Sequence, residues 1–245
     1  MADVIGQRIL GNLVYVDRGA HLKRLLDAIG PDVIKYVDDF TGSTPGIDAA
    51  FDDDWAITRV EEGGGESTIA KGDGVGGIIT ITTDANENDG INAQLLGEAF
   101  KLGSSTVLYF GIRMKISEAT QSDFFAGLCI TNTDLLAGVT DRIGFEKLDG
   151  ATAVKAMLEK DSTETLTASL LTADTSYHIL EFCLDADGTV EFFVDGVSAA
   201  APATTNLPND EELRVSLHFL AGSAAARTMD VDWIRCIQIG GTRAA

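Results

Sequence analysis

An oxygen-rich stretch is the first part of this 245-residue chain whose residue types could do chemistry. Asp84, Asn86, Asn88 and Asp89 supply alternating side-chain oxygens ahead of Gly90, a pattern that hard cations such as calcium favour. The glycine comes one position later than in a helix–loop–helix calcium site, and no glutamate follows at the twelfth position. A polar turn whose side chains bond their own backbone explains the same residues. The sequence therefore predicts no metal or cofactor, with calcium at this loop as the weaker alternative.

The other reactive residue types form no catalytic pattern. The three histidines belong to no Ser/His/Asp or Cys/His arrangement, and His178 alternates with Leu180 and Phe182, which predicts a core histidine. Gly72–Gly77 has phosphate-loop glycines, but a strand pattern follows, so no helix N-terminus would hold a phosphate. The cysteines are odd in number, far apart and set in apolar or alternating runs. They are predicted to be small buried hydrophobic residues rather than a disulfide framework: Cys129, Cys183 and Cys236.

The charge balance excludes several classes of partner. The chain has 18 Lys and Arg against 38 Asp and Glu, a net charge of −20, whereas nucleic-acid binders neutralise phosphates with basic side chains. The same charge disfavours anionic membranes. No window approaches the roughly 18 consecutive apolar residues of a membrane span, and the N-terminus has no secretory signal pattern. We therefore expect a soluble acidic protein with neither a nucleic-acid nor a membrane partner.

From residue 38 onward the sequence predicts β-strands. Val107–Ile116 alternates apolar and polar residues over ten positions, a period of two that a helix could not use, and Leu213–Phe219 does the same. Asp149-Gly150 and Asp187-Gly188 each separate two such runs, which is a strong hairpin signal. This pattern indicates an antiparallel β-sandwich. Further strands are predicted at Trp55–Glu61, Ser67–Lys71, Gly77–Thr83, Ile91–Leu96, Phe124–Thr131 and Met229–Ile239.

The first 37 residues form a separate arm in this interpretation. They carry five basic and four acidic residues, a balance of +1, whereas residues 38–245 carry 13 basic and 34 acidic residues, a balance of −21. A short strand is predicted at Leu13–Val16 and a helix over His21–Ile29, which Gly30 and Pro31 would end. The arm has more apolar surface than so short a segment can bury alone. Its predicted partner-binding residues are Leu13, Tyr15, Leu22, Leu25, Leu26 and Ile29.

Several stretches resemble the concanavalin-A-like lectin/glucanase jelly roll. They are Asp39–Gly42 with Asp53–Trp55, Tyr177–Phe182 leading through Asp187–Val190 to Phe193–Gly196, and Asp232–Ile234. Four others resemble structural proteins of tailed bacteriophages with this fold, namely Ile9–Tyr15, Ser122–Leu128, Leu135–Asp141 and Met229–Trp233. The resemblance implies an all-β jelly-roll domain over residues 38–245, preceded by the arm at 1–37.

The phage resemblance also implies a function. It describes a capsid decoration, or cement, protein on the virion surface, made in the host cytoplasm. Its partner would be the major capsid protein, and a homo-oligomer, with a trimer favoured, would suit the symmetry of the shell. A neutral arm could then dock on the capsid while the acidic body stays solvated.

The resemblance also allows a test for hydrolysis. Glucanases of this fold place their carboxylates on one strand face in an E-x-D-x-(x)-E arrangement. The nearest match, Asp230 and Asp232, has no third carboxylate, so we expect outward-facing aspartates and no enzyme. The alternative is a glycan-binding, lectin-like virion adhesin, which needs an aromatic platform; Trp55 and Trp233 are both expected in the core instead.

Overall fold

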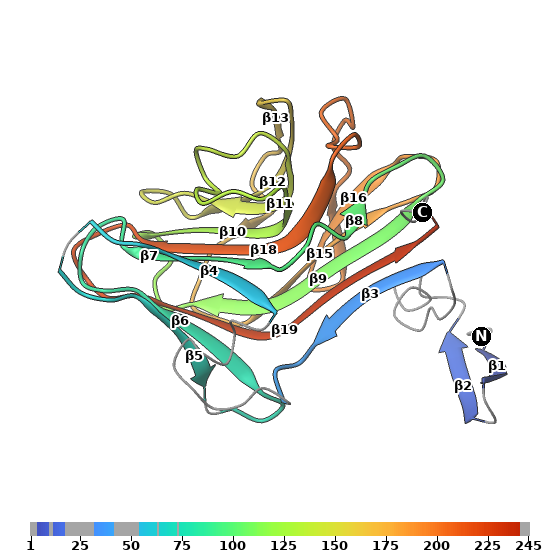
Figure 1. Cartoon of the computed structure of the whole chain (residues 1–245), viewed down its shortest axis with the longest axis horizontal. Helices are drawn as coiled ribbons and strands as arrows, with labels where there is room; N and C mark the ends of the chain where they lie inside the picture. Colours follow the sequence, from blue (N-terminus) through green and yellow to red (C-terminus); the bar gives the residue numbers. More distant parts are fainter. Residues whose placement is uncertain are drawn as a thin grey trace.

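The protein is an antiparallel β-sandwich, as the sequence predicts. The computed structural model describes residues 4–9, 12–17, 32–41, 54–62, 64–72 and 74–240. Two large sheets stack as layers, so that β7, β10 and β18 lie over β9 and β19 (Figure 1). Within the described ranges there is no helix, and hence none that could cross a membrane. A separate pair of strands, β1 (Val4–Ile9) and β2 (Asn12–Asp17), forms an antiparallel hairpin.

The first large sheet has nine strands. They are β4 (Trp55–Val60), β7 (Gly90–Leu95), β8 (Phe100–Lys101), β10 (Ser122–Cys129), β11 (Arg142–Lys147), β12 (Ala153–Lys160), β13 (Thr163–Leu166), β14 (Leu171–Thr172) and β18 (Glu212–Ala221). The strand order is β13-β12-β11-β10-β18-β7-β4, with β14 paired to β12 and β8 to β18. Neighbours that are distant in sequence, such as β18 between β10 and β7, make this a jelly-roll topology rather than a meander.

The second large sheet has eight strands. They are β3 (Val33–Asp38), β5 (Thr68–Gly72), β6 (Ile78–Thr82), β9 (Val107–Ile116), β15 (His178–Leu184), β16 (Val190–Val194), β17 (Val197–Ala200) and β19 (Thr228–Ile239). The order is β17-β16-β15-β9-β19-β6-β5, and β3 pairs with β19. Both predicted hairpins are confirmed: Gly150 joins β11 to β12, Gly188 joins β15 to β16, and both glycines have positive φ angles.

The core lies between the two sheets and follows the predicted alternation. Alternate residues of β9 and β18, such as Phe110 and Leu217, point inward and are fully buried. Phe110 stacks on Phe182 of β15, with ring centroids 5.2 Å apart. All three cysteines are free and buried, which confirms their predicted role as small buried residues. The outward side chains of each sheet therefore face away from this core, so the two outward faces differ in their chemistry.

Strand β3 extends the eight-stranded sheet at the point where the arm was predicted to end. Its residues 33–38 pair with β19 from Ile239 to Ile234, so the strand spans the predicted boundary near residue 38. Tyr36 donates a hydrogen bond from its hydroxyl to Asp38 and packs edge-on against Trp55, with ring centroids 5.9 Å apart. The helix predicted over His21–Ile29 lies outside the described residues.

Removing β3 should destabilise the sandwich. We predict that a 32–245 fragment keeps the melting temperature of the full chain, whereas a 39–245 fragment melts about 5 °C lower, because β19 loses a paired neighbour. Differential scanning calorimetry of the two fragments measures this difference. Equal melting temperatures would show that β3 adds nothing to the stability of the sheet.

Candidate functional site

The outward face of the nine-stranded sheet carries a row of polar side chains across its middle. Strand pairing places Phe125 of β10 opposite His218 of β18, His218 opposite Asn92 of β7, and Asn92 opposite Thr58 of β4. These residues alternate with core residues in each strand, so they share the outward face. Paired residues across neighbouring strands are in side-chain contact distance. The row therefore combines an aromatic ring with an imidazole, an amide and a hydroxyl.

Two members of this row are buried without the hydrogen bonds they could make. His218 is 1% exposed, and neither of its ring nitrogens has a hydrogen-bond partner among the described residues. The side-chain oxygen of Asn92 is equally unpartnered in this part of the chain. Burial lowers the pKa of His218 to about 4, although the carboxylate of Asp134 acts in the opposite direction. Buried polar atoms rarely lack partners, so these atoms are free to accept or donate bonds to a ligand.

The next row on the same face is better satisfied. Gln94 of β7 donates through its amide nitrogen to the hydroxyl of Ser216 and to the carbonyl oxygen of Ile130, both at 3.0 Å. The same nitrogen lies 3.1 Å from the sulfur of Cys129. Burial raises the pKa of the Cys129 thiol to about 12, so this cysteine is a neutral thiol and a poor nucleophile at ordinary pH.

The segment that joins β10 to β11, residues 130–141, folds back over these rows. Its buried side chains Leu135 and Val139 form an apolar cluster with Phe125 and Cys129 of β10. The backbone of Asn132 is bonded twice to β7. Its N–H donates to the side-chain oxygen of Gln94 at 2.9 Å, and its carbonyl accepts from the amide nitrogen of Asn92 at 2.8 Å. The β10–β11 segment is therefore the main cover of the outward face.

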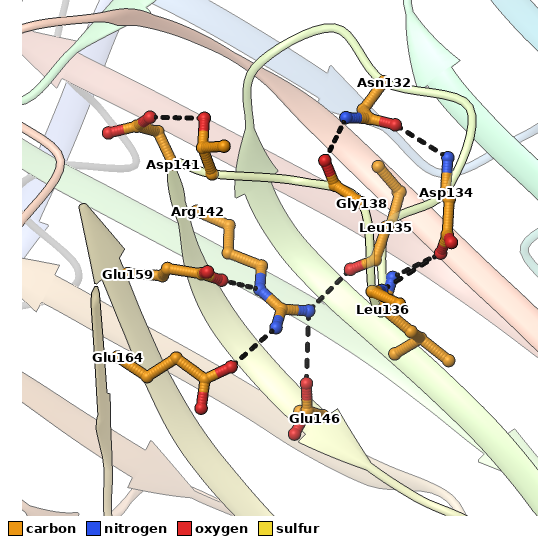
Figure 2. Close-up of polar contacts among 12 residues, drawn as sticks. Asn132, Asp134, Leu135, Leu136, Gly138, Asp141, Arg142, Glu146, Glu159 and Glu164 are labelled. Atoms are coloured by element: carbon orange, nitrogen blue, oxygen red, sulfur yellow. Dashed lines mark hydrogen bonds and ion pairs between the residues drawn. The ribbon is translucent and has the colours of Figure 1, made fainter. Parts of the chain in front are cut away.

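A buried guanidinium lies where this segment meets β11. Arg142 is 2% exposed, donates to Glu159 of β12 at 2.6 Å and lies 3.1 Å from Glu146, four residues along its own strand. It also donates to the carbonyl of Leu135 and approaches Glu164 to 3.5 Å, so one side chain connects three strands and the β10–β11 segment (Figure 2). Such a group satisfies charges that would otherwise be buried unpaired.

Two carboxyl groups on this face have altered acidity. Burial raises the pKa of Glu146, although the nearby Arg142 acts in the opposite direction. Burial also raises the pKa of Asp123 of β10, which accepts a hydrogen bond from the backbone N–H of Asp149 at 2.8 Å. The sequence search missed this pair because it looked for carboxylates along a single strand. Antiparallel pairing instead places Glu146 opposite Phe125, two residues from Asp123.

The oxygen-rich stretch forms a hydrogen-bonded turn. Asn86 donates from its amide nitrogen to Asp84 at 2.9 Å and to Asp89 at 3.0 Å. Asp89 is fully buried and also accepts from the backbone N–H of Glu62 at 2.5 Å, and Asn88 has a positive φ of 65°. Nowhere in the described part of the chain do three or more His, Cys, Asp or Glu side chains gather as a metal site.

Asp230 and Asp232 lie on the outward face of the other sheet. Asp230 pairs with Lys115 at 3.1 Å, and Asp232 pairs with Arg113. The expectation that both tryptophans lie in the core is confirmed for Trp55 and wrong for Trp233. A β-bulge between residues 231 and 233 turns that ring outward, where Arg235 covers it at 4.3 Å. A covered ring is not an open sugar platform.

The remaining predicted residues lie apart from the polar rows. The prediction that His178 is a core residue is wrong. Its ring is partly exposed at the start of β15, where Nδ1 lies 2.8 Å from a carboxylate oxygen of Asp195 and Nε2 lies 3.2 Å from one of Asp174. Of the arm residues, Leu13 and Tyr15 belong to β2. The others lie outside the described residues: Leu22, Leu25, Leu26 and Ile29.

Several solved structures with a similar fold are glucanases or glycoside hydrolases, and others have no assigned function. An endo-1,3-beta-glucanase from Streptomyces sioyaensis is 15% identical, with a TM-score of 0.61 over 87% of this chain and 99% of that one. A glycoside hydrolase family 16 endo-glucanase from Bacteroides ovatus is 13% identical, with a TM-score of 0.57 over 82% and 99%. A glycoside hydrolase family protein from Mycobacterium thermorestibile is 16% identical, with a TM-score of 0.56 over 82% and 99%. No family model and no curated protein matches the chain.

These comparisons confirm the concanavalin-A-like jelly roll and correct the functional interpretation. The expectation of a non-enzymatic decoration protein of a tailed-phage capsid is wrong, because the neighbours named above are glucanases and glycoside hydrolases. They agree better with the alternative prediction, a glycan-binding protein. The phage-like stretch Leu135–Asp141 belongs to the β10–β11 segment and supplies Leu135 and Val139 to the apolar cluster with Phe125. The oligomeric state and the partner of the arm stay predictions.

The buried histidine should make stability depend on pH. Because the pKa of His218 is lowered from 6.5 to about 4, the unfolded chain binds more protons in this range, and stability is lost as pH falls from about 6.5 to about 4. We predict that His218→Phe removes about 3 kcal/mol of this pH-dependent loss. Urea unfolding of both proteins at pH 7 and pH 4 gives the difference. Parallel pH profiles would show that His218 is already hydrated in the native state.

Chelators should change stability little. The carboxylates of Asp84 and Asp89 already accept hydrogen bonds from Asn86 and Glu62, so the turn needs no ion to hold it. We predict a melting-temperature shift below about 2 °C on adding EDTA, measured with and without calcium. A fall of ten degrees or more that calcium restores would identify this turn as a cation site.

Proposed function

We propose that this chain binds a neutral glycan on the outward face of its nine-stranded sheet. The observation that carries the proposal is that His218 and Asn92 lie opposite each other on β18 and β7, with buried polar atoms that have no partner in the described part of the chain. The likeness in fold to glucanases supports the same class of ligand. The other sheet is less suited, because Arg235 covers the ring of Trp233 and ion pairs occupy Asp230 and Asp232.

The chemistry of the face fits a sugar ring. Amide, imidazole and hydroxyl groups donate and accept hydrogen bonds in the geometry that sugar hydroxyls need, and His218, Asn92, Gln94 and Thr58 supply them from three adjacent strands. Phe125 adds an apolar ring beside His218, against which the C–H face of a pyranose can pack. Ligand sites commonly combine an apolar wall with a few convergent polar groups.

The charge of the chain selects among glycans. The net charge is −20, and exposed carboxylates lie close to the face at Glu98, which binds Thr131, and at Asp134 and Glu164. These groups repel uronate and sulfate polymers through unscreened like charge at low salt. A neutral glucan has no such penalty, so neutral polysaccharides are the class that this face should prefer.

Hydrolysis of the bound glycan is the second candidate function. The observation that favours it is the pair Asp123 and Glu146 on the same face, because burial raises the pKa of both carboxyl groups and a general acid must hold its proton near the working pH. Asp123 is two residues before Phe125 on β10, and Glu146 lies opposite Phe125 on β11. Asp123 is the candidate proton donor to a glycosidic oxygen, because the ion pair with Arg142 favours the charged form of Glu146.

Binding is tested by calorimetry with soluble β-glucan oligosaccharides, with an anionic uronate polymer as the negative class. We predict that His218→Phe and Thr58→Val each weaken glucan binding about fivefold, the effect of one lost hydrogen bond. The matched control is Thr82→Val, the same change at a half-buried threonine of β6 in the other sheet. Its affinity should equal that of the unchanged protein.

The result that contradicts the proposal is a binding loss with Thr82→Val but not with Thr58→Val, or binding of the uronate polymer in preference to glucan. The same oligosaccharides are assayed for new reducing ends to test hydrolysis. Release that Asp123→Asn or Glu146→Gln abolishes, while Asp230→Asn leaves it intact, would assign the reaction to this face.

A further inference from the structure

The β10–β11 segment has the build of a compact loop that can move as a unit. Its neck is closed by a backbone hydrogen bond from Ile130 to Asp141 at 3.1 Å. Inside it, the Asn132 side chain accepts from the N–H of Asp134 and donates to the carbonyl of Gly138, and Asp134 accepts from Leu136 (Figure 2). Loops of this length with close ends and their own internal bonds are cooperative units.

Several of the contacts that hold the segment on β7 and β10 are contacts that a sugar would use, in addition to the bond from Arg142 to the carbonyl of Leu135. The backbone N–H and carbonyl of Asn132 occupy the Gln94 and Asn92 side chains, as two hydroxyl groups of a glycan would. Leu135 occupies the apolar side of Phe125, where a pyranose ring would pack. The segment therefore satisfies the polar and the apolar half of the face at the same time.

The cover is incomplete in a way that favours exchange. With the segment in place, both ring nitrogens of His218 and the side-chain oxygen of Asn92 stay without partners in the described structure. A closed state that leaves buried polar atoms unbonded is less stable than one that bonds them, so an incoming ligand with more hydroxyl groups can compete.

We propose that the β10–β11 segment is an autoinhibitory lid, and that a glycan reaches the face only after the segment has moved off Phe125 and β7. The inference rests on the proposed glycan binding. Binding to a protein whose open state is rarely populated is weakened by the open fraction, so variants that open the lid bind more tightly. The face thus selects glycans that can replace both the Asn132 contacts and the Leu135 contact.

Cys129 gives a readout of opening that does not need a glycan. It is fully buried under the segment, whereas Cys236 is fully buried between the two sheets. Alkylation with iodoacetamide, followed by peptide mass spectrometry, reports lid opening at Cys129 and global unfolding at Cys236. In the unchanged protein, Cys129 should be labelled faster than Cys236.

The variant is Leu135→Ala, which removes the buried anchor of the segment. We expect the labelling rate of Cys129 and the affinity for β-glucan oligosaccharides to rise together by about tenfold. Labelling of Cys236 should rise too, because loss of the buried anchor also destabilises the closed state relative to the unfolded chain, but it should stay slower than labelling of Cys129. The matched control, Leu148→Ala, makes the same change at an exposed leucine outside the segment and should alter neither. Val139→Ala is the second opening variant if Leu135→Ala does not fold.

The outcomes separate the two proposals. Equal labelling of Cys129 and Cys236 in every protein would overturn the lid, because the segment would open only on global unfolding. Faster Cys129 labelling with unchanged glucan affinity would overturn autoinhibition while leaving the binding proposal intact. Cys129 labelling faster than Cys236 labelling, with no glucan binding by any variant, would refute the proposed function. It would also show that glucan is not the ligand admitted by the lid.

Discussion

Burial of both faces of one sheet, the inward face by the apolar core and the polar outward face by residues 130–141, is the constraint from which the other features of this molecule follow. The inward residues of β10, β18 and β7 form the core, so the alternating residues must point outward. Here the outward side chains are shielded from solvent, because residues 130–141 cover them. The covered side chains can form hydrogen bonds only with groups in this confined space. Among the described residues, both ring nitrogens of His218 and the side-chain oxygen of Asn92 have no partner.

The same constraint explains the ion-pair cluster at β11. Glu146 and Glu159 point outward by alternation and become buried under the segment and the neighbouring strands. Isolated buried carboxylates would be strongly destabilising, and Arg142 neutralises them while it also holds the carbonyl of Leu135 (Figure 2). The cluster thus couples the position of the segment to the charge state of the sheet. Acidic groups elsewhere, such as Asp230 on the other sheet, pair with surface lysine or arginine and need no such arrangement.

Local sequence rules predicted the parts of the fold that depend on local chemistry. Period-two alternation identified β9 and β18, and Asp-Gly pairs identified two hairpins, because backbone geometry alone decides both. Short strands such as β13 (Thr163–Leu166) were not predicted, because four largely exposed residues have no apolar face. Strand β3 was not predicted, because the charge balance of residues 1–37 suggested a separate arm.

The site was harder to predict because it is assembled across strands. His218 was visible only as a polar residue alternating with Leu217 and Phe219. Its burial is a tertiary property without a local signal, since Leu135 packs on Phe125, the residue opposite His218. Asp123 and Glu146 are 23 positions apart, so a search along one strand does not find them. Trp233 turned outward because a β-bulge shifted the alternation of β19. The signal that could have found the face is the matched alternation of Asn92 and Gln94 with Ile91 and Ala93.

The most direct test of glycan binding on this face is a nuclear magnetic resonance titration of the isotopically labelled full chain with a neutral β-glucan oligosaccharide. Binding to the outward face of the nine-stranded sheet predicts the largest shift changes at Asn92, Gln94, His218 and the backbone amide of Asn132. Changes confined to Trp233, Arg235 and their neighbours on the other sheet would contradict it, as would a spectrum that saturating glucan leaves unchanged.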